Sequence, residues 1–221
     1  WAEPSAKAIW GSVQAVIVDV VAQVGVPDAI GIANQRETLV AWDSKTSQPI
    51  CPAPIWQCRR TAEASARLIA EGHDPFVIAR TGLGINPLFP AGKAAWVLEH
   101  IPAARDLLAQ GRLRMGTVDS WLLWNLTGGA VFATDHSNAS RTQLFDTERL
   151  VFTTDLARLF GAEIACLPTP LPSDSLFGTT AAGSTALPAG IPIHAIMGDS
   201  HAALYGHGIR TPGAVKATYG T

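Results

Sequence analysis

An arginine and a glutamate lie side by side between two apolar stretches, in the segment GIANQRETLVAWD at residues 31–43. Residues 29–33 are typical of a short buried strand, and the chain turns apolar again at Leu39. A guanidinium donates hydrogen bonds and a carboxylate accepts them, so Arg36 and Glu37 together can bind neighbouring hydroxyls of one ligand. The alternative is a surface ion pair, which contributes only about 0–1 kcal/mol to stability. The pair indicates either a polyol-binding strand end or an ordinary charged turn.

A second candidate is the acidic residue in AIMGDSHAALYG, residues 195–206. An apolar strand leads into Gly198, Asp199 follows, and the next residues favour a helix. Open α/β sheets bind ligands beyond the carboxyl ends of their strands, which is where Asp199 is expected. There it can act as a general base toward a substrate hydroxyl. Alternatively, Asp199 or Ser200 simply caps the helix, and the segment alone favours neither reading.

Three weaker signals accompany these two. Trp56 in IWQCRRT is either a core residue or a stacking wall for the carbon face of a polyol. Residues 218–221, TYGT, can offer backbone and hydroxyl donors to a phosphate, although such a sequence is usually only a turn. The pairing of Asp135 with His136, and of Asp199 with His201, suggests a metallohydrolase. That alternative is disfavoured because no His-Glu-x-x-His motif and no histidine pair at helical spacing is present.

Composition bounds the class of protein. The chain has 221 residues, of which 48% are hydrophobic and 15% charged, enough for the core of a single α/β domain. A net charge of −2 argues against binding to nucleic acid or to a membrane surface. Three cysteines without metal-ligand spacing are expected to be reduced thiols of a cytoplasmic protein. We expect no membrane span and no signal peptide.

Helical and strand patterns alternate along the chain. Apolar spacing predicts a helix over 5–24 ended by Gly25, an amphipathic helix over 59–71, and a helix over 118–129 closed by paired glycines. Further helices are predicted at 93–100 and 103–110, a hairpin at 38–50, and strand, turn and helix start over 191–208. Residues 168–192 are expected to be loop or short strand, and 213–221 a strand. This alternation predicts an α/β domain.

Taken together, these segments resemble the FGGY family of carbohydrate kinases, and glycerol kinases in particular. GIANQRETLVAWD, PAPIWQCRRTAE, GTVDSWLLWNLTGG, ATDHSNASRTQLFD, GIPIHAIMGDSHAALYGHG and GAVKATYGT follow in the order and at the spacing of that family. PLFPAGKAAWVLEH resembles its first signature, with Lys93 and Trp96 in place. The resemblance covers essentially the whole chain. It implies a ribonuclease-H-like domain of the actin/hexokinase type and ATP-dependent phosphorylation of a primary hydroxyl of a small polyol or sugar.

The resemblance also implies roles for individual residues. Substrate contacts fall on Arg36, Glu37, Trp56 and Asp199, with Asp199 as the base and as a contact for Mg²⁺. Gly220 and Thr221 match the start of a phosphate-binding motif for ATP. Two further substrate-site positions depart from glycerol kinases: Leu88 stands where a tyrosine is usual, and Ser200 where a glutamine is usual. Because sites built on polar contacts discriminate strongly, a pentose, a ketose or a tetritol joins glycerol as an expected substrate, and a non-catalytic sugar-binding paralogue stays an alternative.

The family resemblance bears on domain organisation as well. Residues 1–221 are expected to form the substrate-binding N-terminal domain without its first strands, which carry a phosphate motif, and without the C-terminal domain. Phosphoryl transfer depends on positioning around the γ-phosphate, so we expect this piece alone to be catalytically silent. The expected partner is a small polyol or sugar, with neither nucleic acid nor membrane, and a homo-oligomer is compatible with the sequence.

Overall fold

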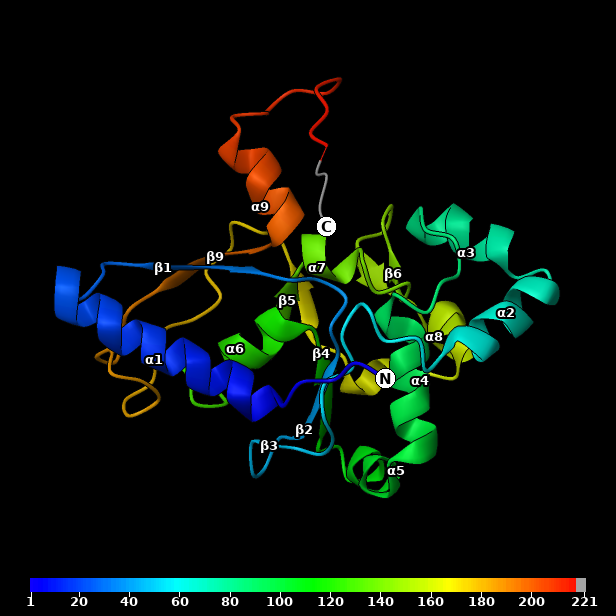
Figure 1. The fold of residues 1–221 in the computed structure, drawn as a ribbon, viewed down its shortest axis with the longest axis horizontal. Helices are drawn as coiled ribbons and strands as arrows, with labels where there is room; N and C mark the ends of the chain where they lie inside the picture. Colours follow the sequence, from blue (N-terminus) through cyan, green and yellow to red (C-terminus); the bar gives the residue numbers. More distant parts are fainter. Residues whose placement is uncertain (218–221) are drawn as a thin grey trace.

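A parallel pair of strands joins the two ends of the chain. β1 (Ile30–Asn34) lies beside β9 (Ile193–Gly198), and their register sets Asn34 opposite Gly198. The computed structural model describes residues 1–217, and the ribbon in Figure 1 shows α1 (Ala6–Val24) running along this pair while α9 (Asp199–Gly206) rises from the end of β9. The carboxyl ends of β1 and β9 therefore meet at the foot of α9.

Shorter sheets and helices complete the domain. An antiparallel sheet has the order β3 (Gln48–Pro49), β2 (Val40–Asp43), β4 (Leu113–Gly116), while β5 (Ala133–Asp135) pairs in parallel with β8 (Thr169–Leu171) and β6 (Phe145–Asp146) pairs with β7 (Val151–Phe152). The remaining helices are α2 (Ala62–Ala70), α3 (Asp74–Thr81), α4 (Pro90–His100), α5 (Pro102–Ala109), α6 (Val118–Leu126), α7 (His136–Ala139), α8 (Thr154–Phe160) and the 3₁₀ turn Ile164–Cys166.

The first helix forms where its apolar spacing predicts. The side chain of Ser5 accepts a hydrogen bond from the backbone N–H of Ala8, and Gly25 ends the helix with φ of 85°. One face of α1 packs on a core cluster through residues Ile9, Trp10, Val13 and Ile17. The same cluster contains the aromatic contacts of Trp42 with Trp121 and Trp124, from β2 and α6.

The C-terminal half of the same apolar side of α1 is only partly covered. Val16, Val20 and Val24 are exposed, and with Val13 and Ile17 they line an apolar groove of about 400 Å³ between α1 and β1. By length and composition alone, α1 is long and apolar enough to cross a membrane. The expectation of no membrane span stays a prediction, because the length and composition of one helix do not decide it.

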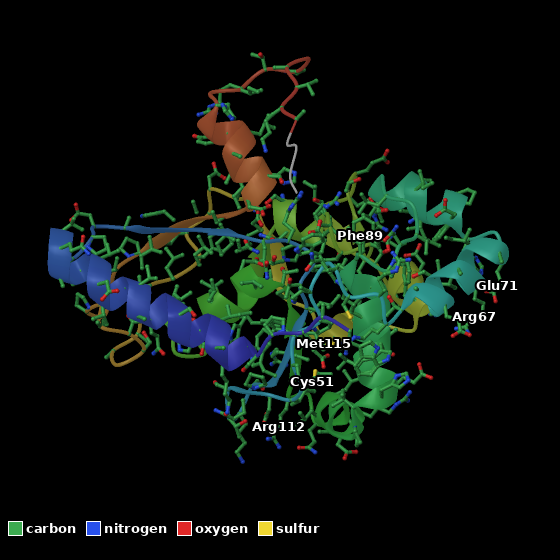
Figure 2. The ribbon with its side chains drawn as sticks, in the orientation of Figure 1. Cys51, Arg67, Glu71, Phe89, Arg112 and Met115 are labelled. Atoms are coloured by element: carbon green, nitrogen blue, oxygen red, sulfur yellow. The ribbon has the colours of Figure 1, made fainter. Side chains whose placement is uncertain are left out.

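A second core cluster lies under α4 and α5. It joins Leu39 and Ala41 of the β2 segment to Val97 of α4 and Met115 of β4, which is labelled in Figure 2. The three cysteines form no disulfide. Because α4 packs on this cluster, its first turn is held against the segment that follows β1.

The longer predicted elements agree with the structure, whereas several short elements and one terminal strand do not. The hairpin, the helices over 5–24 and 59–71, and the strand–helix joint at Asp199 are confirmed within a few residues. Short elements that the sequence did not predict are α3, α7, α8 and β4 to β7. The predicted strand at 213–221 is wrong for residues 213–217, where Val215 is 87% exposed and no neighbouring strand offers backbone partners. Residues 218–221 lie outside the described part of the chain.

Candidate active site

The parallel register of β1 and β9 brings two predicted residues together. Arg36 follows the end of β1 and Asp199 follows the end of β9, so they extend from adjacent strand ends. The Arg36 Nε atom lies 3.2 Å from the Asp199 Oδ1 atom, and the Arg36 Nη2 atom donates to the Ser200 hydroxyl at 3.0 Å. The position at the carboxyl ends of parallel strands is where open α/β sheets bind ligands.

Gly198 is what allows Arg36 to lie there. A Cβ atom at residue 198 would approach the Arg36 Cδ at 2.5 Å and the Cγ at 2.7 Å, well inside van der Waals contact. The backbone of Gly198 has φ of −61° and ψ of 142°, which any residue can adopt. Its lack of a side chain therefore serves the close approach of Arg36 rather than the backbone conformation.

Glu37 faces a different partner from Arg36. Its Oε1 atom accepts a hydrogen bond from the Arg141 Nε at 2.7 Å, while the Arg36 Nε is 4.0 Å away. The Arg141 guanidinium also lies over the ring of Phe89, 4.9 Å from its centroid, and Phe89 is labelled in Figure 2. Glu37 adopts φ of 64°, which costs a non-glycine residue about 1 kcal/mol, and this turn separates its side chain from that of Arg36. Arg141 was not among the predicted site residues.

A buried polar network lies beneath this surface layer. The side chains of Asn34 and Asn138 exchange two hydrogen bonds of 2.9 and 3.0 Å, and Asn138 donates to Asp135 at 2.7 Å. Asp135 also accepts from the Ser173 hydroxyl and from the backbone of Ser137, whose own hydroxyl accepts from the Gly198 N–H. The network joins the ends of β1, β5 and β9, so it fixes the strand ends from which Arg36 and Asp199 extend.

A polar hollow opens beside α9. It has a volume of about 620 Å³, and of the predicted residues it is lined by Arg36 and Ser200, together with Arg141 and His201. The Nδ1 atom of His201 is buried and has no hydrogen-bond partner within residues 1–217. Burial, and then the neighbouring Arg36 guanidinium, lowers the pKa of His201, so the imidazole is neutral at pH 7 and can accept or donate one hydrogen bond.

Four predicted substrate residues lie outside the lining of that hollow: Glu37, Trp56, Leu88 and Asp199. Leu88 is connected to Glu37 through Lys93, whose Nζ atom donates to the backbone carbonyls of both residues. Trp56 is 44% exposed, which excludes the core reading of this tryptophan and leaves the stacking role a prediction. The phosphate-binding prediction for Gly220 and Thr221 falls outside the described residues.

The helix-capping alternative for Asp199 is met in part. The N-cap of α9 is Gly198, which provides no side-chain cap, and the Asp199 Oδ1 atom accepts locally from the Ser200 N–H at 2.6 Å. The Asp199 carboxylate is nevertheless 56% exposed and also faces Arg36. Local capping and ligand contact are therefore compatible in this residue.

The side chains of the site suit Mg²⁺ better than a metal that is held by several protein ligands. Within residues 1–217, no group of three or more histidine, cysteine, aspartate or glutamate side chains is placed to hold a metal ion. Mg²⁺ needs less from the protein, because it is usually bound through one or two carboxylates together with waters and substrate phosphates. The exposed carboxylate of Asp199 fits that requirement.

The sequence matches a protein-family model and curated relatives of one kind. Residues 1–206 match the model of the FGGY family of carbohydrate kinases, N-terminal domain. Glycerol kinase of Symbiobacterium thermophilum is 45% identical over 225 aligned residues, covering 100% of this chain and 45% of the relative. Glycerol kinase of Trichlorobacter lovleyi is 47% identical over 223, covering 99% of this chain and 45% of the relative. The chain thus spans a little under half the length of the curated relatives it matches.

Solved structures support the same conclusion for the fold. Plasmodium falciparum glycerol kinase with ADP superposes with a TM-score of 0.86 at 28% identity, covering 94% of this chain and 42% of that one. Xylulose kinase from Rhodospirillum rubrum gives a TM-score of 0.85 at 24% identity, covering 96% of this chain and 44% of that one. The predicted α/β fold class is confirmed, and the chain belongs to the FGGY family of carbohydrate kinases.

Proposed function

We propose that the protein containing this chain transfers the γ-phosphoryl group of ATP to a primary hydroxyl of a small polyol, with glycerol as the first candidate. The observation that carries the proposal is the meeting of Asp199, Arg36 and Glu37 at the ends of two neighbouring strands. The 45% and 47% identity to glycerol kinases supports glycerol, and the ADP in the Plasmodium falciparum structure supports nucleotide use. In this proposal, residues 1–221 supply the substrate-binding N-terminal part.

Asp199 is the proposed base. Its carboxylate is 56% exposed and can accept the proton of the attacking hydroxyl, and Arg36 lies beside it as an ion-pair partner at 3.2 Å. As the proton leaves, the hydroxyl oxygen attacks the γ-phosphorus and the bond to ADP breaks. Mg²⁺, held in part by Asp199, would neutralise charge on the phosphates when it is bound.

Glu37 is the proposed acceptor for the remaining hydroxyls. Its carboxylate is held by Arg141 through Oε1, so it presents a fixed edge to the ligand. Leu88 and Trp56 are proposed to contact the carbon side of the polyol, and Ser200 to contact it through its hydroxyl. Gly220 and Thr221 stay assigned to the ATP phosphates by resemblance.

A longer substrate is the second candidate. The hollow beside α9 has a volume of about 620 Å³, and its lining includes the polar side chains of Arg36, Arg141 and Ser200. Their donors can bind the additional hydroxyl of a tetritol, pentitol or ketose.

ADP release by the full-length protein tests both candidates, with glycerol, erythritol, xylitol, ribulose and xylulose as acceptors. We expect glycerol to give the highest kcat/KM. If a four- or five-carbon acceptor exceeds glycerol, the second candidate is correct. If no acceptor stimulates ADP release, the non-catalytic sugar-binding alternative replaces the kinase proposal.

The variant Asp199→Asn tests the base. It keeps the shape of the side chain and removes its proton affinity, so we expect kcat to fall by about 10²–10⁴-fold while polyol binding is partly retained. Asp28→Asn, in the exposed segment before β1, is the matched control and should leave kcat unchanged. An unaltered kcat in Asp199→Asn would falsify the assignment.

A further inference from the structure

Lys93 is a fully buried cation in the first turn of α4. Its side chain has 0% exposure, although a lysine ammonium is costly to remove from water. Burial lowers the pKa of Lys93 to about 8, so the group is still mostly charged at neutral pH. A buried charge of this kind needs an explanation in the contacts it makes.

Those contacts lie with the candidate substrate residues. Lys93 Nζ donates to the backbone carbonyl of Glu37 at 2.7 Å and to that of Leu88 at 2.6 Å. Glu37 and Leu88 come from separate segments, the turn after β1 and the turn before α4. The two short hydrogen bonds therefore clamp these segments to one atom.

A second link joins the same two segments. Arg141 binds the Glu37 carboxylate with Nε and lies over the ring of Phe89, the residue after Leu88. The backbone of Glu37 is thus tied to Leu88 by Lys93, and its side chain is tied to Phe89 by Arg141. The turn itself is stiffened by Asn86, whose Oδ1 atom accepts from the Leu88 N–H.

We propose that Lys93 is a positioning residue that sets the separation between Glu37 and Leu88, and thereby selects acceptors by size. The inference rests on the proposed function, because it assumes that Glu37 and Leu88 both face the polyol. Lys93 itself is buried beneath the two turns and acts through their carbonyls. Without the ammonium, the two carbonyls lose their shared donor and the turns are free to move apart.

The test compares Lys93→Met with wild type in the full-length protein. Methionine has a similar length and no donor, so we expect KM for glycerol to rise at least tenfold while KM for ATP stays within twofold. The ratio of kcat/KM for glycerol to that for xylitol should fall at least threefold, because a looser pocket accepts the longer chain better. This change of preference is one that a general loss of stability does not produce.

Two further variants serve as an independent test of the link and as a control. Arg141→Gln removes the second link without touching Lys93, and we expect it to shift the glycerol-to-xylitol ratio in the same direction, which keeps the inference testable if Lys93→Met does not fold. Lys45→Met removes an exposed lysine from the β2–β3 turn, and its kinetics should match wild type.

The possible results separate the two proposals. If wild type phosphorylates glycerol and both Lys93→Met and Arg141→Gln keep the wild-type KM and acceptor ratio, the positioning role is wrong while the proposed function stands. If wild type phosphorylates none of the acceptors, the proposed function fails and the inference fails with it.

Discussion

A single methyl group at residue 198 is the sharpest probe of the site. In Gly198→Ala the new Cβ would lie 2.5 and 2.7 Å from the Arg36 Cδ and Cγ, which are mid-chain atoms that cannot bend aside independently. The arginine must therefore leave its place over the strand end. It then loses the 3.2 Å approach to Asp199 and the 3.0 Å hydrogen bond to Ser200.

The structure sets the size of the expected effect. In the proposed site Arg36 donates to the polyol, and a hydrogen bond from a charged group is worth about 1.5–3 kcal/mol, so its displacement should lower kcat/KM for the polyol by about 10–150-fold. Alanine suits this backbone, but the clash with Arg36 removes the gain that an unstrained Gly→Ala change would give. The loss of the hydrogen bond to Ser200 and of a partly exposed ion pair should lower stability by about 1–3 kcal/mol.

ADP release by the full-length protein, with thermal unfolding measured in parallel, checks this prediction. Gly31→Ala is the matched control, since a Cβ at residue 31 of β1 meets its nearest atom, the Ala195 Cβ, at 3.9 Å. We expect Gly31→Ala to keep wild-type kinetics. If Gly198→Ala folds normally and retains kcat/KM within threefold of wild type, Arg36 does not serve the substrate site in the way proposed here.

Two other predictions concern stability, and both are read from thermal unfolding of the full-length protein. Asn138→Leu should lower the free energy of unfolding by about 2–4 kcal/mol, because the buried Asn34 and Asp135 side chains lose the hydrogen bonds of Asn138. A loss below about 1 kcal/mol would show that the network does not hold the strand ends. Asp43 is paired with Arg112, which Figure 2 places at the β2–β3 end of the domain, and the hydrogen bonds from Arg112 lower the pKa of Asp43 to about 2. Because this pKa is below its usual 3.8, the pair stabilises above about pH 4 and loses its effect as the pH falls toward 2. The free energy of unfolding of wild type should exceed that of Asp43→Asn by about 1 kcal/mol at pH 7, a value that allows for solvent screening of the partly exposed Arg112. This difference in stability should disappear as the pH falls toward about 2. A difference that does not change with pH would contradict the assignment.

Local signals predicted the longer elements well. The spacing of Ile9, Val13 and Ile17 was sufficient for α1, because the periodicity of a helix is written in nearby residues and a glycine marks its end. α3 and α8 were missed because eight and seven residues are too few for a periodic pattern to stand out. The strand predicted around Val215 does not form for a different reason: a valine-containing segment becomes a strand only beside another strand, and sequence patterns do not report that partner.

The candidate site shows the same division between local and distant information. Arg36, Glu37 and Asp199 were recognised by residue type and by family resemblance, and the approach of Arg36 to Asp199 then follows from the β1–β9 register. Arg141, 104 residues from Glu37, has no local feature that connects the two. Its segment ATDHSNASRTQLFD resembles the family, but the resemblance implies no role for the arginine, and only the fold places it against Glu37.

The adjacent Arg36 and Glu37 do not form a tight pair with each other, and this matters for function. The positive φ of Glu37 turns the chain, so the cation faces Asp199 and Ser200 while the anion faces Arg141. A carboxylate has about four acceptor positions. In Glu37, only the Oε1 atom accepts a hydrogen bond from a group within residues 1–217. Oε2 is therefore free to accept from a ligand, which a close ion pair with Arg36 would have opposed. The strained turn at Glu37, held by Lys93 beneath it, is what converts an ordinary charged dipeptide into two separate binding groups.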